Sequence, residues 1–164
     1  MGVNKKLLHV FVLPEDDANL RLATEFQAQI HFTRQRQMYV LDVANGWTRV
    51  LDLFAGVHVA EMRRNPKRLL VLLIDFDQDP ARLDRVKRSI PGDLGDRVFV
   101  LGVWTEAEDV KPYGQTAAEL ARDCRDGTTG TWGGELLSHN AGEVERLRKH
   151  AASIFFPSAS NMLG

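Results

Sequence analysis

Two aspartates, Asp75 and Asp77, follow an unbroken apolar run that begins at Leu69. A run of this kind is typical of a strand that is buried on both faces of a parallel sheet. Side chains two residues apart on a strand point the same way, so both carboxylates are expected to project together at the carboxyl end of the strand. Ligands bind at this edge in open α/β sheets. Two convergent carboxylates there would hold a divalent metal ion.

Further acidic residues follow the other apolar segments of the chain. They are Glu15 and Asp16 after the first segment, Asp79 shortly after Asp77, and Glu106 and Glu108 after the fourth segment. Because the carboxyl ends of parallel strands share one edge of a sheet, these groups are expected to converge in space. Mg²⁺ and Mn²⁺ prefer hard oxygen ligands of this type. A metal ion held there would polarise a phosphodiester and stabilise its developing charge.

Several of these residues also have a purely structural interpretation. Asp79 precedes Pro80, and this pair predicts a helix that Asp79 caps. Asp16 would complement the dipole of a helix that begins beside it. His139 would supply a proton-transfer group or a phosphate contact near the site, or it would belong to a surface turn in which Asn140 caps the last helix.

Three arginines, Arg82, Arg85 and Arg88, recur at a spacing that places them on one face of the helix after Pro80. On that face they would contact phosphate groups near the acidic residues. The alternative is a solvated helix face with no ligand.

The order of apolar and helical segments indicates an α/β fold with a mainly parallel sheet of about four strands flanked by helices. The chain reads as one domain, residues 1–164, with a C-terminal helical extension at about 115–156. Strands are expected at 7–13, 38–43, 69–77 and 98–104. Helices are expected from 14, at 47–63, from 79, at 116–125 and at 143–155. Residues 126–134 are expected to form a loop and the tail from 157 to be frayed.

The length and composition of the chain exclude several classes of protein. The 164 residues suffice for one full-sized core, and the net charge of −1 excludes a globally basic nucleic-acid binder. The single cysteine, Cys124, fits a reducing cytosol. No apolar stretch approaches the roughly 20 residues that span a bilayer. We therefore expect a cytoplasmic protein without a membrane segment.

The segments VLPEDDAN and LLIDFD, over roughly the first 110 residues, resemble the core of the TOPRIM family. That family includes topoisomerases, primases, overcoming-lysogenization-defect nucleases and small proteins found beside bacterial phage-defence ATPases. The resemblance implies a TOPRIM-like, Rossmannoid fold in which Glu15 does acid/base work while Asp75 and Asp77 bind magnesium. It implies a nuclease-like, Mg²⁺- or Mn²⁺-dependent protein that acts on nucleic acid, with an ATPase or other protein subunit as partner. Self-association as a homodimer is a further expectation for such a short chain.

A second resemblance is to the response-regulator receiver domain. VFVLPEDDANLRLATEF is similar to the opening strand, acidic pair and first helix of a receiver, and Lys111-Pro112-Tyr113 is similar to its Lys-Pro turn. In that case Asp75 would be the phosphorylated residue. The alternative function is therefore a non-catalytic signalling or adaptor domain, receiver-like or a degenerate TOPRIM, that acts through a protein partner.

Overall fold

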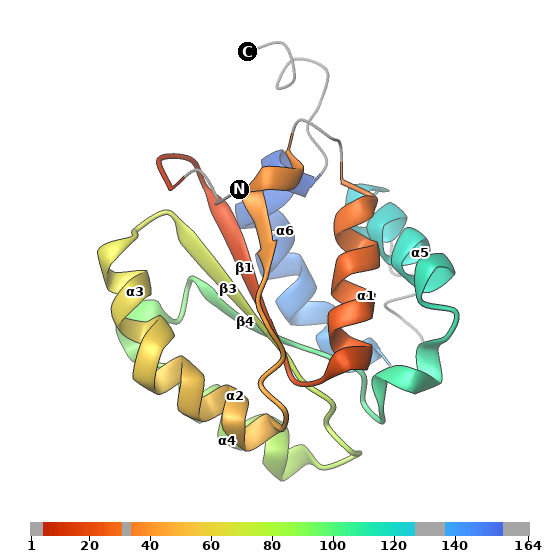
Figure 1. Cartoon of the computed structure of the whole chain (residues 1–164), viewed down its shortest axis with the longest axis horizontal. Coiled ribbons are helices and arrows are strands. Elements are labelled where there is room, and N and C mark those ends of the chain that lie inside the picture. The colour runs from red at the N-terminus through yellow and green to blue at the C-terminus, as the bar shows by residue number, and fades with distance from the viewer. Residues whose placement is uncertain (1–4, 31–33, 127–136, 156–164) are drawn as a thin grey trace.

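A four-stranded parallel sheet forms the centre of the molecule (Figure 1). The computed structural model describes residues 5–30, 34–126 and 137–155. The strands are β1 (His9–Pro14), β2 (Met38–Val40), β3 (Arg68–Leu73) and β4 (Val98–Leu101), in the order β2-β1-β3-β4. Every pairing is parallel. The predicted α/β class with a parallel sheet of about four strands is thus confirmed.

Helices connect the strands and follow the last one. They are α1 (Asp17–Ala28), α2 (Trp47–Leu53), η2 (Phe54–His58), α3 (Val59–Arg64), α4 (Pro80–Arg88), α5 (Tyr113–Asp126) and α6 (Ala141–Phe155). Short 3-10 turns are η1 (Gln35–Gln37), η3 (Gly92–Leu94), η4 (Ala107–Val110) and η5 (Ser138–Asn140). The helix expected at 47–63 is continuous but contains one π-helical turn, η2. Residues 127–136, which include most of the expected loop, and the tail from 156 lie outside the described residues.

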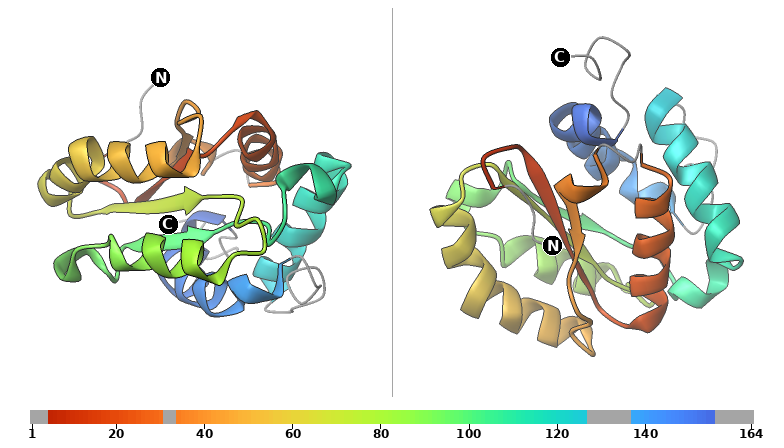
Figure 2. Two further views of the ribbon diagram at one scale, coloured as in Figure 1. Left: turned by 90° about the horizontal axis from the view of Figure 1, so that it is seen from below. Right: turned by 45° about the horizontal axis from the view of Figure 1, so that its top comes forward.

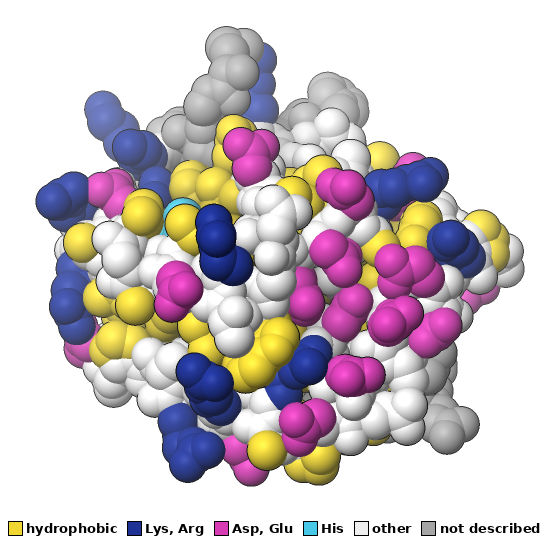
Figure 3. Space-filling model, turned by 60° about the horizontal axis from the view of Figure 1, so that its bottom comes forward, with side chains coloured by type: hydrophobic (Ala, Val, Ile, Leu, Met, Phe, Trp, Pro, Cys, Tyr) yellow, Lys and Arg dark blue, Asp and Glu magenta, His cyan; other side chains and the backbone are white. Residues whose placement is uncertain are grey.

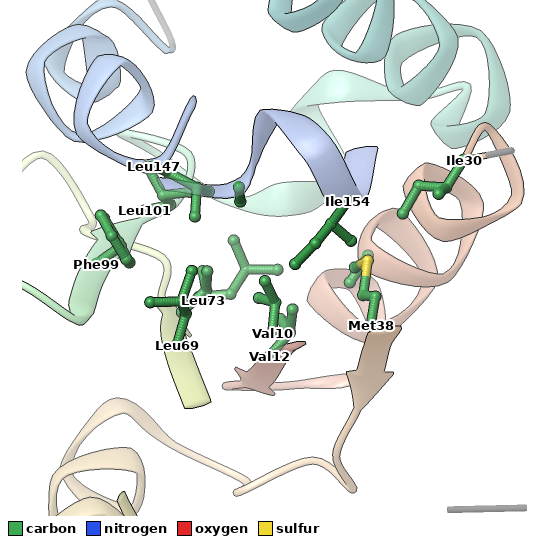
Figure 4. Close-up of a cluster of buried hydrophobic side chains, with 13 residues drawn as sticks. Val10, Val12, Ile30, Met38, Leu69, Leu73, Phe99, Leu101, Leu147 and Ile154 are labelled. Carbon is green, nitrogen blue, oxygen red and sulfur yellow. The ribbon is translucent and has the colours of Figure 1, made fainter. Parts of the chain in front are cut away.

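The helices cover both faces of the sheet, which gives three layers (Figure 2). Alternate strand residues such as Val10, Val12 and Leu73 pack against α1 and α6 (Figure 4). The intervening residues, such as Leu70 and Leu72, pack against α2, α3 and α4. Burial on both faces explains why the strands read as continuous apolar runs rather than alternating ones. Among the described helices, none is long and apolar enough to cross a membrane.

The outer edge of β4 is covered by side chains of the α6 segment. Asn140 bonds both backbone groups of Gly102, at 3.2 Å to the N–H and 2.8 Å to the carbonyl. The amide N–H of Val100 donates to Glu143 Oε2 at 2.8 Å. Arg146 donates to the Val98 carbonyl at 3.0 Å. These side chains satisfy backbone groups that a further strand would otherwise take. The Asn140 side chain, directly before α6, therefore bonds the backbone at the end of β4.

The replacement Arg146→Ala is expected to destabilise the protein by about 1–3 kcal/mol, because it leaves the Val98 carbonyl and the Glu143 carboxylate without their charged partner. The free energy of unfolding, measured by urea denaturation, checks this. Lys149→Ala, at an exposed position of the same helix, is the control and should change stability by less than about 0.5 kcal/mol. Equal stability of the two variants would contradict the role of α6 at this edge.

Strands β3 and β4 both end earlier than expected. β3 ends at Leu73, and Asp77 and Gln78 have φ angles of 51° and 55°. The expectation that the strand runs to residue 77 and carries both aspartates is therefore wrong, because Asp75 and Asp77 both follow the end of β3 and Asp77 has a left-handed backbone. β4 ends at Leu101, where Gly102 turns the chain with a φ of 155°.

Candidate functional site

Glu15 and Asp75 meet at the carboxyl edge of the sheet, as their positions after two parallel strands predict. β1 and β3 are neighbours, and the Asp75 amide N–H donates to Glu15 Oε2 at 2.8 Å. The Glu15 amide N–H in turn donates to the Leu73 carbonyl at 2.9 Å. Glu15 is half-buried and Asp75 is 7% exposed. The Glu15 carboxylate thus lies against the backbone of Asp75, and its charge acts on the Asp75 carboxyl group.

The Asp75 carboxyl group is held by two donors from different elements. Its Oδ1 accepts from Asn19 Nδ2 of α1 and from the Ala107 amide of η4, each at 3.1 Å. Burial, followed by the charges of Asp16 and Glu15, raises the pKa of Asp75 to about 7, against the opposing effect of the two hydrogen bonds. Asp75 is therefore a carboxyl group that titrates near neutral pH when no cation is bound.

The pKa of Glu15 is also raised. Burial is the largest cause, and the carboxylates of Asp16 and Glu108 add to it, while the Asp75 N–H and the Arg82 charge oppose it. Negative charges from three separate segments thus act on one another at this edge. A divalent cation would relieve this repulsion.

Asn19 is a residue of the site that the sequence interpretation missed. It is fully buried, and its Nδ2 bridges Asp16 Oδ1 at 3.0 Å and Asp75 Oδ1 at 3.1 Å. Its Oδ1 is buried and has no hydrogen-bond partner among the described residues. A buried acceptor without a partner is unusual in a folded protein. The available signal was its place in the first turn of a helix directly after the acidic segment.

Three of the remaining acidic residues have structural roles at the starts of helices. Asp16 caps α1 by accepting from the Asn19 amide, and Asp79 caps α4 by accepting from the Ala81 amide. Glu106 forms a capping box with Asp109 at the start of η4. Glu108 is exposed, and its charge contributes to the field at Glu15.

Asp77 lies in different surroundings from Asp75. Its side chain is 72% exposed, and Oδ2 lies 3.8 Å from Arg82 Nη2. The expected pairing of Asp75 and Asp77 around one point depended on an extended strand, which the left-handed backbone at Asp77 interrupts. Within residues 5–30, 34–126 and 137–155, no three Asp, Glu, His or Cys side chains are arranged to share a metal ion.

His139 lies among aromatic rings. Its ring centroid is 5.1 Å from that of Phe76 and 5.2 Å from that of Trp104. Burial lowers the pKa of His139, and the Gly102 backbone opposes this only in part. His139 therefore favours the neutral form, and it packs against the rings of Phe76 and Trp104.

Two of the three arginines predicted to share a helix face converge on one tryptophan. The guanidinium carbons of Arg82 and Arg85 lie 4.9 and 5.1 Å from the centre of the Trp47 ring. Arg82 also donates to the Asp75 carbonyl at 2.8 Å. Arg88 instead makes a long 3.4 Å hydrogen bond to the Asp84 carbonyl of its own helix. Trp47 was not recognised from the sequence.

The acidic and basic groups lie on one face of the molecule. In the view of the strands' carboxyl ends, Asp and Glu side chains gather in one area, and an apolar patch flanked by Lys and Arg side chains adjoins it (Figure 3). Such a surface combines candidate metal ligands with candidate phosphate contacts. Comparison of the chain with protein-family models, curated protein sequences and solved structures found no significant match.

Proposed function

We propose that this protein is a Mg²⁺- or Mn²⁺-dependent, nuclease-like protein that acts on nucleic-acid phosphodiesters. The observation that supports this most directly is the pairing of Glu15 and Asp75, with Asp75 titrating near pH 7, beside the Arg82 guanidinium. A strongly shifted carboxyl group such as that of Asp75, at the ligand-binding edge of an α/β sheet, is a candidate functional group. The TOPRIM resemblance of the two segments that carry these residues agrees with this proposal.

The residues at this edge fit a hard divalent cation. Asp75 and Glu15 would supply carboxylate oxygens, Asp16 lies beside them, and the buried amide oxygen of Asn19 has no partner among the described residues. Magnesium is commonly held by one or two carboxylates, with water and substrate phosphate as its other ligands, so a complete protein cage is not required. When bound, the ion would supply Lewis-acid polarisation of a phosphate. Asp77 would join only if the segment after Asp75 changed its conformation.

The other side chains of the edge have roles consistent with this chemistry. Glu15 has a raised pKa and one oxygen held by the Asp75 amide, so it would hold or transfer a proton at its carboxyl group. Arg82 and Arg85 would bind backbone phosphates. A net charge of −1 gives little general attraction for nucleic acid, so a partner subunit, such as an ATPase of a phage-defence system, or a second copy would assist substrate capture. We place this activity in the cytoplasm.

Calorimetric titration with Mn²⁺ and Mg²⁺ tests the metal site. Wild type should bind at least one ion, Asp75→Asn should lose this binding, and Asp96→Asn should retain it because Asp96 is exposed at the opposite end of β4. A Mn²⁺-dependent nuclease assay on single-stranded and duplex DNA and RNA follows, with Glu15→Gln expected to be inactive. Wild type that binds neither ion, with or without nucleic acid, would contradict the proposal.

A second candidate function is the non-catalytic adaptor or signalling domain. It is favoured by the two hydrogen bonds that Asp75 Oδ1 accepts. These bonds join α1 and η4 to the end of β3, and they would stabilise the fold without any metal ion. In this case neither wild type nor Asp75→Asn would bind a metal ion. The receiver version further requires that acetyl phosphate label Asp75, which mass spectrometry of the intact protein would detect.

A further inference from the structure

Trp47 and two arginines of α4 form a stacked cluster next to the carboxyl groups. Trp47 is half-buried at the start of α2, and Arg82 and Arg85, three residues apart on α4, both lie within 5.1 Å of its ring centre. Two guanidinium groups on one indole ring are a more specific arrangement than a single cation–π contact. The cluster therefore brings together two like charges that would otherwise repel each other.

Arg82 joins this cluster to the carboxyl site. One of its terminal nitrogens donates to the Asp75 carbonyl, while its buried Nε has no hydrogen-bond partner among the described residues. Its contact with Asp77, at 3.8 Å to a largely exposed carboxylate, contributes little. Arg85 forms no ion pair in the described part of the chain. The positive charge of the cluster is thus incompletely compensated.

The geometry points to Trp47 as a positioning residue that holds Arg82 and Arg85 as a two-arginine clamp for a backbone phosphate of nucleic acid. Stacking restrains a guanidinium through its face and leaves the N–H groups at its edge available to phosphate oxygens. The ring thus orders both arginines without occupying their donors. The choice of nucleic acid as the source of the phosphate rests on the proposed function, because the clamp adjoins the carboxyl groups (Figure 3).

Binding of a fluorescein-labelled single-stranded oligothymidylate, followed by anisotropy over a range of NaCl concentrations, tests the clamp. Arg85→Gln should weaken binding about tenfold and reduce the slope of log K against log salt by about 0.7, the value for one phosphate contact on a single strand. Trp47→Leu should weaken binding to a similar extent, and Trp47→Phe should restore most of it because the ring face remains. Lys87→Gln removes an exposed charge from the same helix and is the matched control. Circular dichroism establishes that each variant is folded.

The same titrations in EDTA and with Ca²⁺ separate the clamp from the metal site. In one outcome, Ca²⁺ strengthens oligonucleotide binding by the same factor in wild type and Arg85→Gln, while Arg85→Gln binds more weakly than wild type both in EDTA and with Ca²⁺. This result would support the metal site and the clamp. If Ca²⁺ has no effect but the Arg85→Gln and Trp47→Leu defects remain, the clamp stands and the metal site fails. Oligonucleotide binding by Arg85→Gln or Trp47→Leu that equals the Lys87→Gln control would overturn the clamp, as would the absence of any binding by wild type.

Discussion

Replacement of Asp75 by asparagine is expected to stabilise the protein at pH 8 and, at the same time, to abolish binding of Mn²⁺ and Mg²⁺. The ionised carboxylate of Asp75 is unfavourable in the folded state because it is buried and lies near Asp16 and Glu15. Asparagine has nearly the same shape, and its amide oxygen would still accept from Asn19 and Ala107. The variant therefore removes the repulsion and retains the packing.

The effect depends on pH in a definite direction. The pKa of Asp75 is about 7 in the folded protein and about 3.9 in an unfolded chain, so the folded state binds the proton more tightly. The corresponding stability is fully present below about pH 4 and is lost as the pH rises through about 7. Above that value the loss amounts to at most about 4 kcal/mol. The unfolding free energies of wild type and Asp75→Asn should thus converge near pH 4 and diverge toward pH 8.

Urea denaturation between pH 4 and pH 8, with and without Mg²⁺, measures this difference. His9, His58 and His139 also have lowered pKa values, but they titrate in both proteins and largely cancel in the comparison. Mg²⁺ should raise the stability of wild type at pH 8 and leave Asp75→Asn unchanged. If Asp75→Asn is less stable than wild type at pH 8, the carboxylate has a structural role and the adaptor hypothesis is favoured.

The convergence of Glu15 and Asp75 was predictable because it follows from local signals. An apolar run buried on both faces predicts a parallel strand, and parallel strands place their carboxyl ends at one edge. The capping role of Asp79 before Pro80 is equally local. The edge at which each of these residues lies is thus set by local patterns, whereas the contact of Glu15 with Asp75 also requires β1 and β3 to be neighbours in the sheet.

The positions of Asp77 and Asn140 depend on contacts that are distant in the sequence. The left-handed turn at Asp77 and Gln78 is accompanied by a 2.7 Å hydrogen bond from the Gln78 amide to the Trp104 carbonyl. The Asn140 side chain pairs with the backbone of Gly102, which is distant in the sequence. The approach of α4 to Trp47 is likewise a tertiary arrangement. In a single sequence, neither the spacing nor the types of the residues indicate which distant residues will be in contact.

The variant Gly102→Ala is expected to lose more than about 4 kcal/mol of stability, or to fail to fold. A Cβ atom at Gly102 would lie 1.7 Å from the Ile74 carbonyl oxygen, which is far inside any allowed contact. The obstacle is backbone, so no side-chain rotation can relieve it. The Ile74 amide also donates to the Leu101 carbonyl at 2.9 Å, and Asn140 holds Gly102 from the other side. Neither chain segment can therefore move without breaking hydrogen bonds.

Thermal and urea denaturation of Gly102→Ala and Gly92→Ala provide the comparison. Gly92 is exposed and has no atom within 4 Å of its Cβ position, so its replacement should change stability by less than about 1 kcal/mol. Since Ile74 directly precedes Asp75, a Gly102→Ala protein that does fold should have a displaced Asp75 and weakened Mn²⁺ binding. Wild-type stability in Gly102→Ala would mean that the chain after β4 does not approach β3 this closely. In that case, the close packing that places Asp75 beside Glu15 and Ala107 would be incorrect.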